Sequence, residues 1–227
     1  MADLYKKLSK YTLQDAINLE FEDEQFLALK YLYENKKFSD EVFILLVLAN
    51  ALVSYQLSWT WEDYWWEFSK KAETNFVNNN ILDFFEFLLT RWKNNKRFTK
   101  TKLKRVEKFL NSDFSSFDKI KWEEFYKNMF ELAVKLWKIM GQSVDAKTIV
   151  FSVKMFSYAC RNVFGYLEYF PYELNLPLDS RLKKIYEKNI WKSSEKQMKE
   201  FYLNLSKKLK IPPLHLDVIL WTKFNAF

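Results

Sequence analysis

The chain has 227 residues and a formal net charge of +7, with 36 lysines and arginines against 29 acidic residues. Only 2 glycines and 4 prolines are present, which argues against a β-rich fold and glycine-rich nucleotide loops and favours an all-α protein. One cysteine and one histidine exclude an intramolecular disulfide and a Cys/His metal cage, and give no support to a catalytic triad that needs a second histidine.

Hydrophobic periodicity predicts a succession of helices. The expected helices lie near residues 12–34, 40–57, 61–77, 79–94, 99–110, 119–140, 145–164, 180–189, 194–209 and 213–224. Residues 111–117 are expected to form a turn between two lobes, and residues 165–178 a long aromatic connection that Pro177 closes just before Asp179.

The second predicted helix contains the longest apolar run of the chain, from Val42 to Val53. This run is about 12 residues long and includes Asn50, so it is too short to cross a bilayer. Ser39 supplies an N-cap before it, and a buried core helix is expected. No charged-then-apolar signal segment opens the chain, so we expect an intracellular protein without a membrane partner.

Nine basic residues between Arg91 and Lys108 accompany a single acid, Glu107, and are interrupted by Trp92 and Phe98. Such a cluster in a chain of positive net charge suits a polyanion partner. An ordinary solubilising surface explains it equally well, and phosphate attraction carries no sequence specificity.

Two stripes share the predicted helix 145–164. The first is apolar and should meet the core: Ile149, Val153, Phe156, Cys160 and Val163. The second lies roughly opposite and offers cations and rings: Lys147, Phe151, Lys154, Tyr158 and Arg161. Lys147 and Lys154 stand ~10 Å apart along the axis, enough to hold two parts of one nucleotide. Spacing alone favours a solvated lysine face instead.

A lysine nucleophile needs a lowered pKa, because an ordinary lysine, with a pKa of about 10.4, is almost fully protonated at pH 7. We expect desolvation, the field of Lys154 and the helix N-terminus to lower the pKa of Lys147. Asp179, just before Ser180, is a good N-cap, and its carboxylate can also stabilise positive charge that develops on a sugar.

The last predicted helix carries one acid in an otherwise apolar stripe of Leu214, Asp217, Trp221 and Phe224. A buried Asp217 would need N–H donors, which a purine edge offers, and Trp221 would give a stacking face. A terminal packing helix with an exposed aspartate is the alternative. His215, between two leucines, is expected to be structural.

Several of these elements resemble one family. Lys-Thr-Ile-Val-Phe from Lys147, the later Lys154–Met155, the Pro-x-Asp-x-Arg element from Pro177, the segment 52–57 and the Asp217/Trp221 pair are similar to the archaeal 8-oxoguanine DNA glycosylase/lyase family, within the helix-hairpin-helix glycosylase superfamily. The match runs from about Gln25 to Trp221. Ser143 and Asp145 stand where many relatives have glycine, whereas Gly141 remains.

The resemblance implies a two-lobed helical helix-hairpin-helix fold, with residues 1–227 as one unit and the hairpin and catalytic segment at about 119–184. It implies a bifunctional repair enzyme that excises 8-oxoguanine from DNA through a lysine Schiff base and cleaves the abasic strand by β-elimination. The implied catalytic residues are Lys147 and Asp179. The implied base-binding residues are Gln25, Ser54, Trp65, Met129, Lys154, Pro177, Asp217 and Trp221, with Trp66 an alternative to Trp65.

No cofactor and no metal are expected, and the partner is damaged DNA bound by a monomer that associates with the nucleoid. The hairpin near residues 141–146 is expected to contact phosphate. The rival interpretation is a noncatalytic helical nucleic-acid-binding module, which would use the same basic and aromatic surface without needing a desolvated Lys147.

Overall fold

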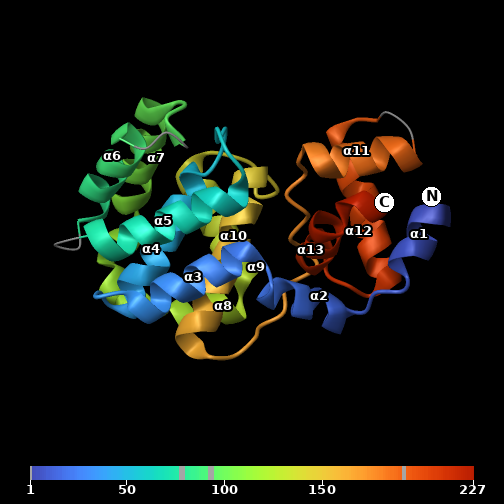
Figure 1. The fold of residues 1–227 in the computed structure, drawn as a ribbon, viewed down its shortest axis with the longest axis horizontal. Coiled ribbons are helices and arrows are strands. Elements are labelled where there is room, and N and C mark those ends of the chain that lie inside the picture. The colour runs from blue at the N-terminus through green and yellow to red at the C-terminus, as the bar shows by residue number, and fades with distance from the viewer. Residues whose placement is uncertain (1, 77–79, 92–94, 191–192) are drawn as a thin grey trace.

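The computed structural model describes residues 2–76, 80–91, 95–190 and 193–227, and within these ranges it contains helices but no strand. Figure 1 shows two groups of helices side by side, a larger one built mainly from α3 to α10 and a smaller one that contains α1 and α11 to α13. The N- and C-termini both lie at the smaller group, and α2 runs between the two groups. The expected all-α, two-lobed fold is confirmed.

Most helices succeed one another with short connections, and a long one joins α10 to α11. They are α1 (Ala2–Leu8), α2 (Leu13–Phe21), α3 (Glu24–Asn35), α4 (Asp40–Val53), α5 (Trp61–Asn75), α6 (Ile81–Arg91), α7 (Thr99–Leu110), α8 (Trp122–Lys127), α9 (Met129–Met140), α10 (Lys147–Phe164), α11 (Ser180–Asn189), α12 (Glu195–Leu209) and α13 (Pro213–Thr222). Short 3-10 turns cover Asp113–Lys119 and Phe224–Ala226. The bounds predicted for α7 and α11 are confirmed, whereas α1 was not predicted.

Two of the predicted helices are each divided. In the segment 12–34, Asp23 caps the N-terminus of α3 by accepting from Gln25 N–H at 3.0 Å, so α2 ends just before it. In the segment 119–140, Asn128 caps α9 by accepting from Glu131 N–H at 3.4 Å. A short polar side chain that bonds to the backbone competes with helix continuation, which explains both breaks.

Helices α4 and α10 form the centre of the larger lobe. Every residue of α4 from Val42 to Val53 is buried, as the apolar run predicts, and α10 packs along it. In α10, every residue from Ile149 to Arg161 is buried, so the polar stripe of this helix is not the solvated face that spacing alone favours. Cys160 lies in the core as expected.

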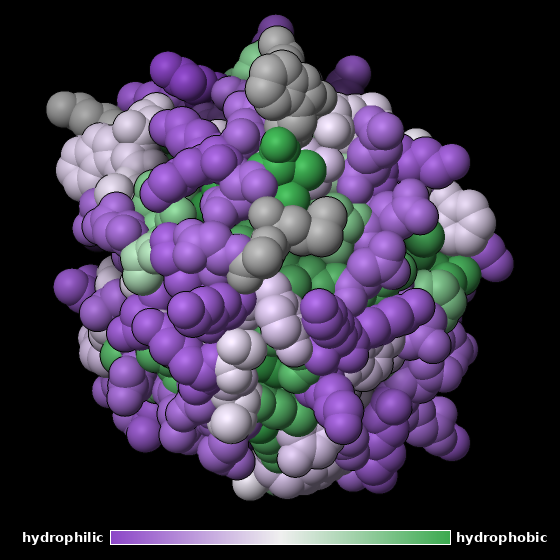
Figure 2. Space-filling view, turned by 90° about the vertical axis from the view of Figure 1, so that its right-hand side faces the viewer, coloured by the Kyte–Doolittle hydropathy of each residue, from purple (hydrophilic) through white to green (hydrophobic). Residues whose placement is uncertain are grey.

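Each lobe has its own hydrophobic core. The smaller core joins α1 and α2 to residues of α11, α12 and α13, with Leu176 and Leu178 from the connection before α11. The turn at 111–117 does not separate the lobes, and that prediction is wrong: Phe114 packs in the larger core, stacked on Trp122 at 5.6 Å between ring centroids. Figure 2 looks onto the smaller lobe, whose face is mainly hydrophilic with apolar residues gathered in a narrow central band.

The basic cluster is only partly a surface. Trp92, with its two neighbours at 93 and 94, lies outside the described residues. Lys102 is fully buried and donates to the carbonyl oxygen of Tyr55 at 2.6 Å, and Arg105 Nε donates to the carbonyl oxygen of Leu52 at 3.1 Å. These two cations stabilise the carbonyl end of α4, where the helix dipole is negative.

Among the described helices, none is both long enough and apolar enough to cross a membrane.

Candidate active site

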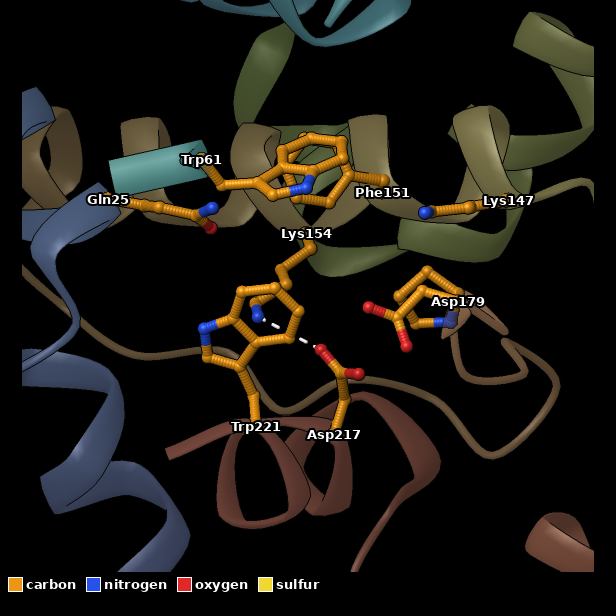
Figure 3. A pocket seen from close by; sticks show the side chains of 9 residues that line it. Gln25, Trp61, Lys147, Phe151, Lys154, Asp179, Asp217 and Trp221 are labelled. Carbon is orange, nitrogen blue, oxygen red and sulfur yellow. Dashed lines mark hydrogen bonds and ion pairs between the residues drawn. The ribbon is translucent and has the colours of Figure 1, made fainter. Parts of the chain in front are cut away.

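A cavity lies where the two lobes meet, and its walls come from five parts of the chain (Figure 3). Its lining residues are Gln25 from α3, Trp61 from α5, Lys147, Phe151 and Lys154 from α10, Pro177 and Asp179 from the connection before α11, and Asp217 and Trp221 from α13. The space among them, including the mouth, is about 360 Å³. Gln25 and Lys147 point into it from opposite sides.

Lys147 is the first residue of α10, and its side chain is exposed at the mouth of the cavity. Its Nζ lies 5.3 Å from the centroid of the Trp61 ring. Desolvation is the main cause that lowers the pKa of Lys147, the positive charge of Lys183 lowers it further, and the carboxylates of Asp179 and Asp217 oppose the shift. The lowered pKa agrees with our expectation, but the positive charge that contributes to it is that of Lys183 and not that of Lys154.

Lys154 is held deep in the cavity between two acids, which explains why it is not the cation that acts on Lys147. Its Nζ donates to Asp217 Oδ2 at 3.0 Å and lies 3.8 Å from Asp23 Oδ2. All three residues are buried. Burial would lower the pKa of Lys154, but the attraction of Asp217 and Asp23 outweighs it and raises that pKa.

A second ion-pair group continues behind Lys154. Glu20 pairs with Arg161 at 2.6 Å, and its other oxygen bonds to His215 Nδ1 at 2.6 Å. The backbone N–H of Phe170 donates to His215 Nε2 at 3.2 Å, so both ring nitrogens of His215 have partners within the protein. His215 is therefore structural, as expected.

Asp179 performs the N-cap role that its position predicts. Its Oδ1 accepts from the backbone N–H groups of Arg181 and Leu182, both at 2.9 Å. These bonds fix the carboxylate at the edge of the cavity, on the same side as Lys147 (Figure 3). The cap therefore orients a negative charge toward the lysine.

Trp221 is held by two side chains from other helices. The guanidinium of Arg181 lies 3.5 Å from the centroid of the indole ring, a close cation–π contact. The indole Nε1 donates to Glu62 Oε1 at 3.3 Å. On the other wall, Trp61 and Phe151 pack edge to face with centroids 4.7 Å apart. The cavity thus has aromatic surfaces on both sides.

Seven of the residues named from the sequence meet in this cavity, and three do not. Ser54 lines a neighbouring cavity that shares Trp61, Lys147 and Phe151 with the first. Trp65 is fully buried, with its ring 6.2 Å from that of Phe151, and Met129 is buried in the larger core. Trp66, the alternative to Trp65, donates to Glu24 at 2.7 Å outside the cavity.

Two lining residues were not among those named. Phe151 belongs to the predicted stripe of Lys147 and Lys154, so its spacing was the available signal. Trp61 stands one helical turn before Trp65, directly after the N-cap Thr60. Residues four apart share one face of a helix, so spacing does not separate the two indoles, and only the packing of α5 decides which one faces the cavity.

Comparison with known proteins places the chain in one group. The family model described as "AGOG: N-glycosylase/DNA lyase" matches residues 5–227. An N-glycosylase/DNA lyase of Nanoarchaeum equitans is 41% identical over 224 residues, covering 98% of this chain and 90% of the relative. One of Thermococcus kodakarensis is 39% identical over 202 residues, covering 88% and 74%.

A solved structure shares the fold. The 8-oxoguanine DNA glycosylase Pa-AGOG of Pyrobaculum aerophilum, crystallised with 8-oxoguanosine, superposes with a TM-score of 0.83 over 98% of this chain and 86% of its own, at 23% sequence identity.

Proposed function

We propose a substrate and a mechanism from the premise that this chain belongs to the AGOG family of N-glycosylase/DNA lyases. Membership makes the chain a DNA glycosylase with abasic-site lyase activity and overturns the rival interpretation of a noncatalytic binding module. The substrate that we propose is 8-oxoguanine in DNA, because the P. aerophilum protein that shares this fold is described as an 8-oxoguanine DNA glycosylase.

The observation that carries the proposal is the meeting of Lys147 and Asp179 at the mouth of a cavity with aromatic walls. A flipped purine is flat and needs stacking faces on either side, and its sugar must stay at the mouth. Trp221 and Phe151 offer these faces. The sugar carbon C1′ is then within reach of Lys147, the one lining lysine that is exposed.

The proposed reaction begins with neutral Lys147, which its lowered pKa makes more abundant. The amine forms a bond to C1′ as the bond from C1′ to the base breaks, and the base leaves with a proton. The C1′–O4′ bond of the resulting glycosylamine then breaks, its remaining N–H proton passes to O4′, and a Schiff base forms between Nζ and C1′. Loss of a proton from C2′ then expels the 3′ phosphate by β-elimination. The Asp179 carboxylate stabilises the positive charge on the sugar and helps to move the proton.

Recognition of the base is assigned to the inner end of the cavity. The carboxylate of Asp217 can accept hydrogen bonds from N–H groups of the purine, while the ion pair with Lys154 favours the charged form of that carboxylate. Gln25 points toward the same space and offers one amide that both donates and accepts (Figure 3). We assign the indole of α5 that contacts this space to Trp61, because Trp65 is buried behind Phe151.

The DNA backbone is assigned to the surface around the hairpin that precedes α10. Gly141 ends α9 with a φ of +64°, a conformation that glycine adopts without strain, and it is adjacent to the ammonium of Lys108. A positive net charge favours contact with phosphate on this side. One chain supplies both proposed catalytic residues and the proposed base-binding residues of the cavity, so the proposed mechanism requires no second copy.

Borohydride trapping on a duplex that contains 8-oxoguanine tests the proposal. A reduced adduct whose mass spectrum places the sugar remnant on Lys147 is the expected result. An adduct on another lysine would contradict the assigned nucleophile. Base release without any adduct would contradict the Schiff base mechanism, and trapping on abasic DNA with no release of 8-oxoguanine would contradict the substrate.

A further inference from the structure

A lysine of α12 ties the hairpin before Lys147 to the opposite lobe. Lys199 of α12 donates to the backbone carbonyl oxygen of Asp145 at 3.1 Å and to its Oδ2 at 2.9 Å. The Lys199 side chain is only 16% exposed, although it lines an open groove between α12 and the hairpin. Glu195, one turn earlier on α12, lies 3.3 Å from the same ammonium and orients it.

This contact connects the two hydrophobic cores. Val144 and Ala146, which flank Asp145, pack against the larger core. Met198 and Tyr202, which flank Lys199 on α12, belong to the smaller core. The two hydrogen bonds therefore fix the hairpin relative to the lobe that supplies Asp217 and Trp221.

The ion pair between Lys199 and Asp145 affects DNA binding because Asp145 lies close to Lys147. At most about 7 Å of chain separates Asp145 from Lys147. A lysine that reaches C1′ brings this hairpin close to the phosphates on either side of the nucleotide. An uncompensated carboxylate there would repel them, whereas Asp145 has its charge cancelled by Lys199 and its other oxygen bonded to Ser143 Oγ.

We propose that Lys199 is a positioning residue of the glycosylase/lyase reaction, which holds the hairpin that carries Lys147 and neutralises Asp145 where the hairpin meets DNA phosphate. This inference rests on the proposed function of Lys147. Because the Asp145 carboxylate has a partner from α12, a hairpin that carries this acid is compatible with DNA phosphate nearby.

The test is single-turnover cleavage of abasic DNA by Lys199→Met, with Lys196→Met as the matched control. Lys196 is an exposed residue of the same groove, so both variants lose one positive charge. We expect Lys199→Met to cleave about 10-fold to 100-fold more slowly, since small displacements of a reacting group cost this much. We expect Lys196→Met to stay within about twofold of the parent.

A second substitution separates the charge from the fold. Asp145→Asn added to Lys199→Met removes the repulsion, so binding should recover, and its salt dependence should return toward that of the parent. Lys199→Arg should keep most activity, because it retains a cation for the same carboxylate. If Lys199→Met does not fold, Lys199→Gln makes the same comparison, since it keeps an N–H donor without the charge.

Equal rates for Lys199→Met and Lys196→Met would overturn the proposal. So would a loss in Lys199→Met that Asp145→Asn leaves unchanged while Lys199→Arg also fails. The parent protein must trap on Lys147 in the same experiment, which keeps a failure of the proposed mechanism distinct from a failure of this inference.

Discussion

Lys147 and Lys154 stand two turns apart on one face of one helix, yet their surroundings shift their pKa values in opposite directions. At the mouth, no carboxylate in the part of the chain that the structure describes is in salt-bridge contact with Lys147, and desolvation lowers its pKa. Deep in the cavity, Lys154 pairs with Asp217 and Asp23, which raise its pKa. The first is suited to give up its proton and attack, and the second is suited to remain a cation. Both residues are lysines on the same stripe of α10, so the groups around each side chain decide its role.

The largest expected effect comes from removing the amine of Lys147, the proposed nucleophile of the pair. Lys147→Gln cannot form an imine, so base release and borohydride trapping should fall by about 10³-fold or more, while binding to DNA with 8-oxoguanine persists. Single-turnover assays and a binding titration measure the two properties on one preparation. Lys184→Gln, at an exposed position of α11, is the control for loss of one charge. Trapping at the parental rate would rule out Lys147 as the nucleophile.

The second prediction concerns stability. Lys154→Met leaves Asp217 and Asp23 buried without their cation, and should lower the free energy of unfolding by about 3–5 kcal/mol in urea titrations near pH 7. Burial raises the pKa of both acids. Loss of Lys154 removes the charge that opposes this shift, so both pKa values should be raised further in the variant, and the deficit should shrink as the pH falls through them and the two acids become protonated. Asp217→Asn should partly restore the variant. A loss below about 1 kcal/mol would contradict the ion-pair assignment.

Much of the fold follows from the local sequence, whereas the cavity depends on distant parts of it. The bounds of α7 and α11 were predictable because periodicity and, for α11, the Asp179 cap mark them. The breaks at Asp23 and Asn128 were missed because each cap lies within a continuous periodic stretch. A capping side chain competes with the helix only through a local hydrogen bond, which periodicity does not record.

The same distinction between local and distant parts of the sequence applies to the candidate site. The two stripes of α10 can be predicted from the sequence, but burial of the polar stripe depends on two acids that are distant in sequence. Asp217 lies more than 60 residues after Lys154, and Asp23 lies near the other end of the chain. Phe151 shares that stripe and could have been named on spacing. The choice of Trp61 over Trp65 could not be made, since it depends on how α5 packs against α10.

The third prediction tests the aromatic wall. Trp221→Ala removes the ring that Arg181 and Glu62 hold in place, and should slow release of 8-oxoguanine by about tenfold or more, because stacking on a base is worth about 1–3 kcal/mol. Cleavage of a preformed abasic site should change much less, since no purine is present. Comparing both substrates with one folded variant separates the effects. Equal losses on both would mean that Trp221 supports the fold or general DNA binding.

The smallest expected effect sharpens the comparison between the two lysines. The amine of Lys147 must be neutral to attack, so the rate of the chemical step should rise with pH and level off above a midpoint that lies below the usual lysine value of 10.5. Lys183 contributes to that lowering through its positive charge. Lys183→Gln should therefore move the midpoint upward and slow the reaction at neutral pH, with little change in the plateau at high pH.

Lys184→Gln separates this local effect from a loss of overall charge. Its exposed side chain is next to Lys183 in sequence but is not among the groups that shift the pKa of Lys147. The pH profile of this control should keep the parental midpoint, whereas both variants lose the same attraction for DNA. A pH profile identical for Lys183→Gln and Lys184→Gln would show that the field of Lys183 does not reach the nucleophile. Desolvation would then be left as the cause that lowers the pKa of Lys147.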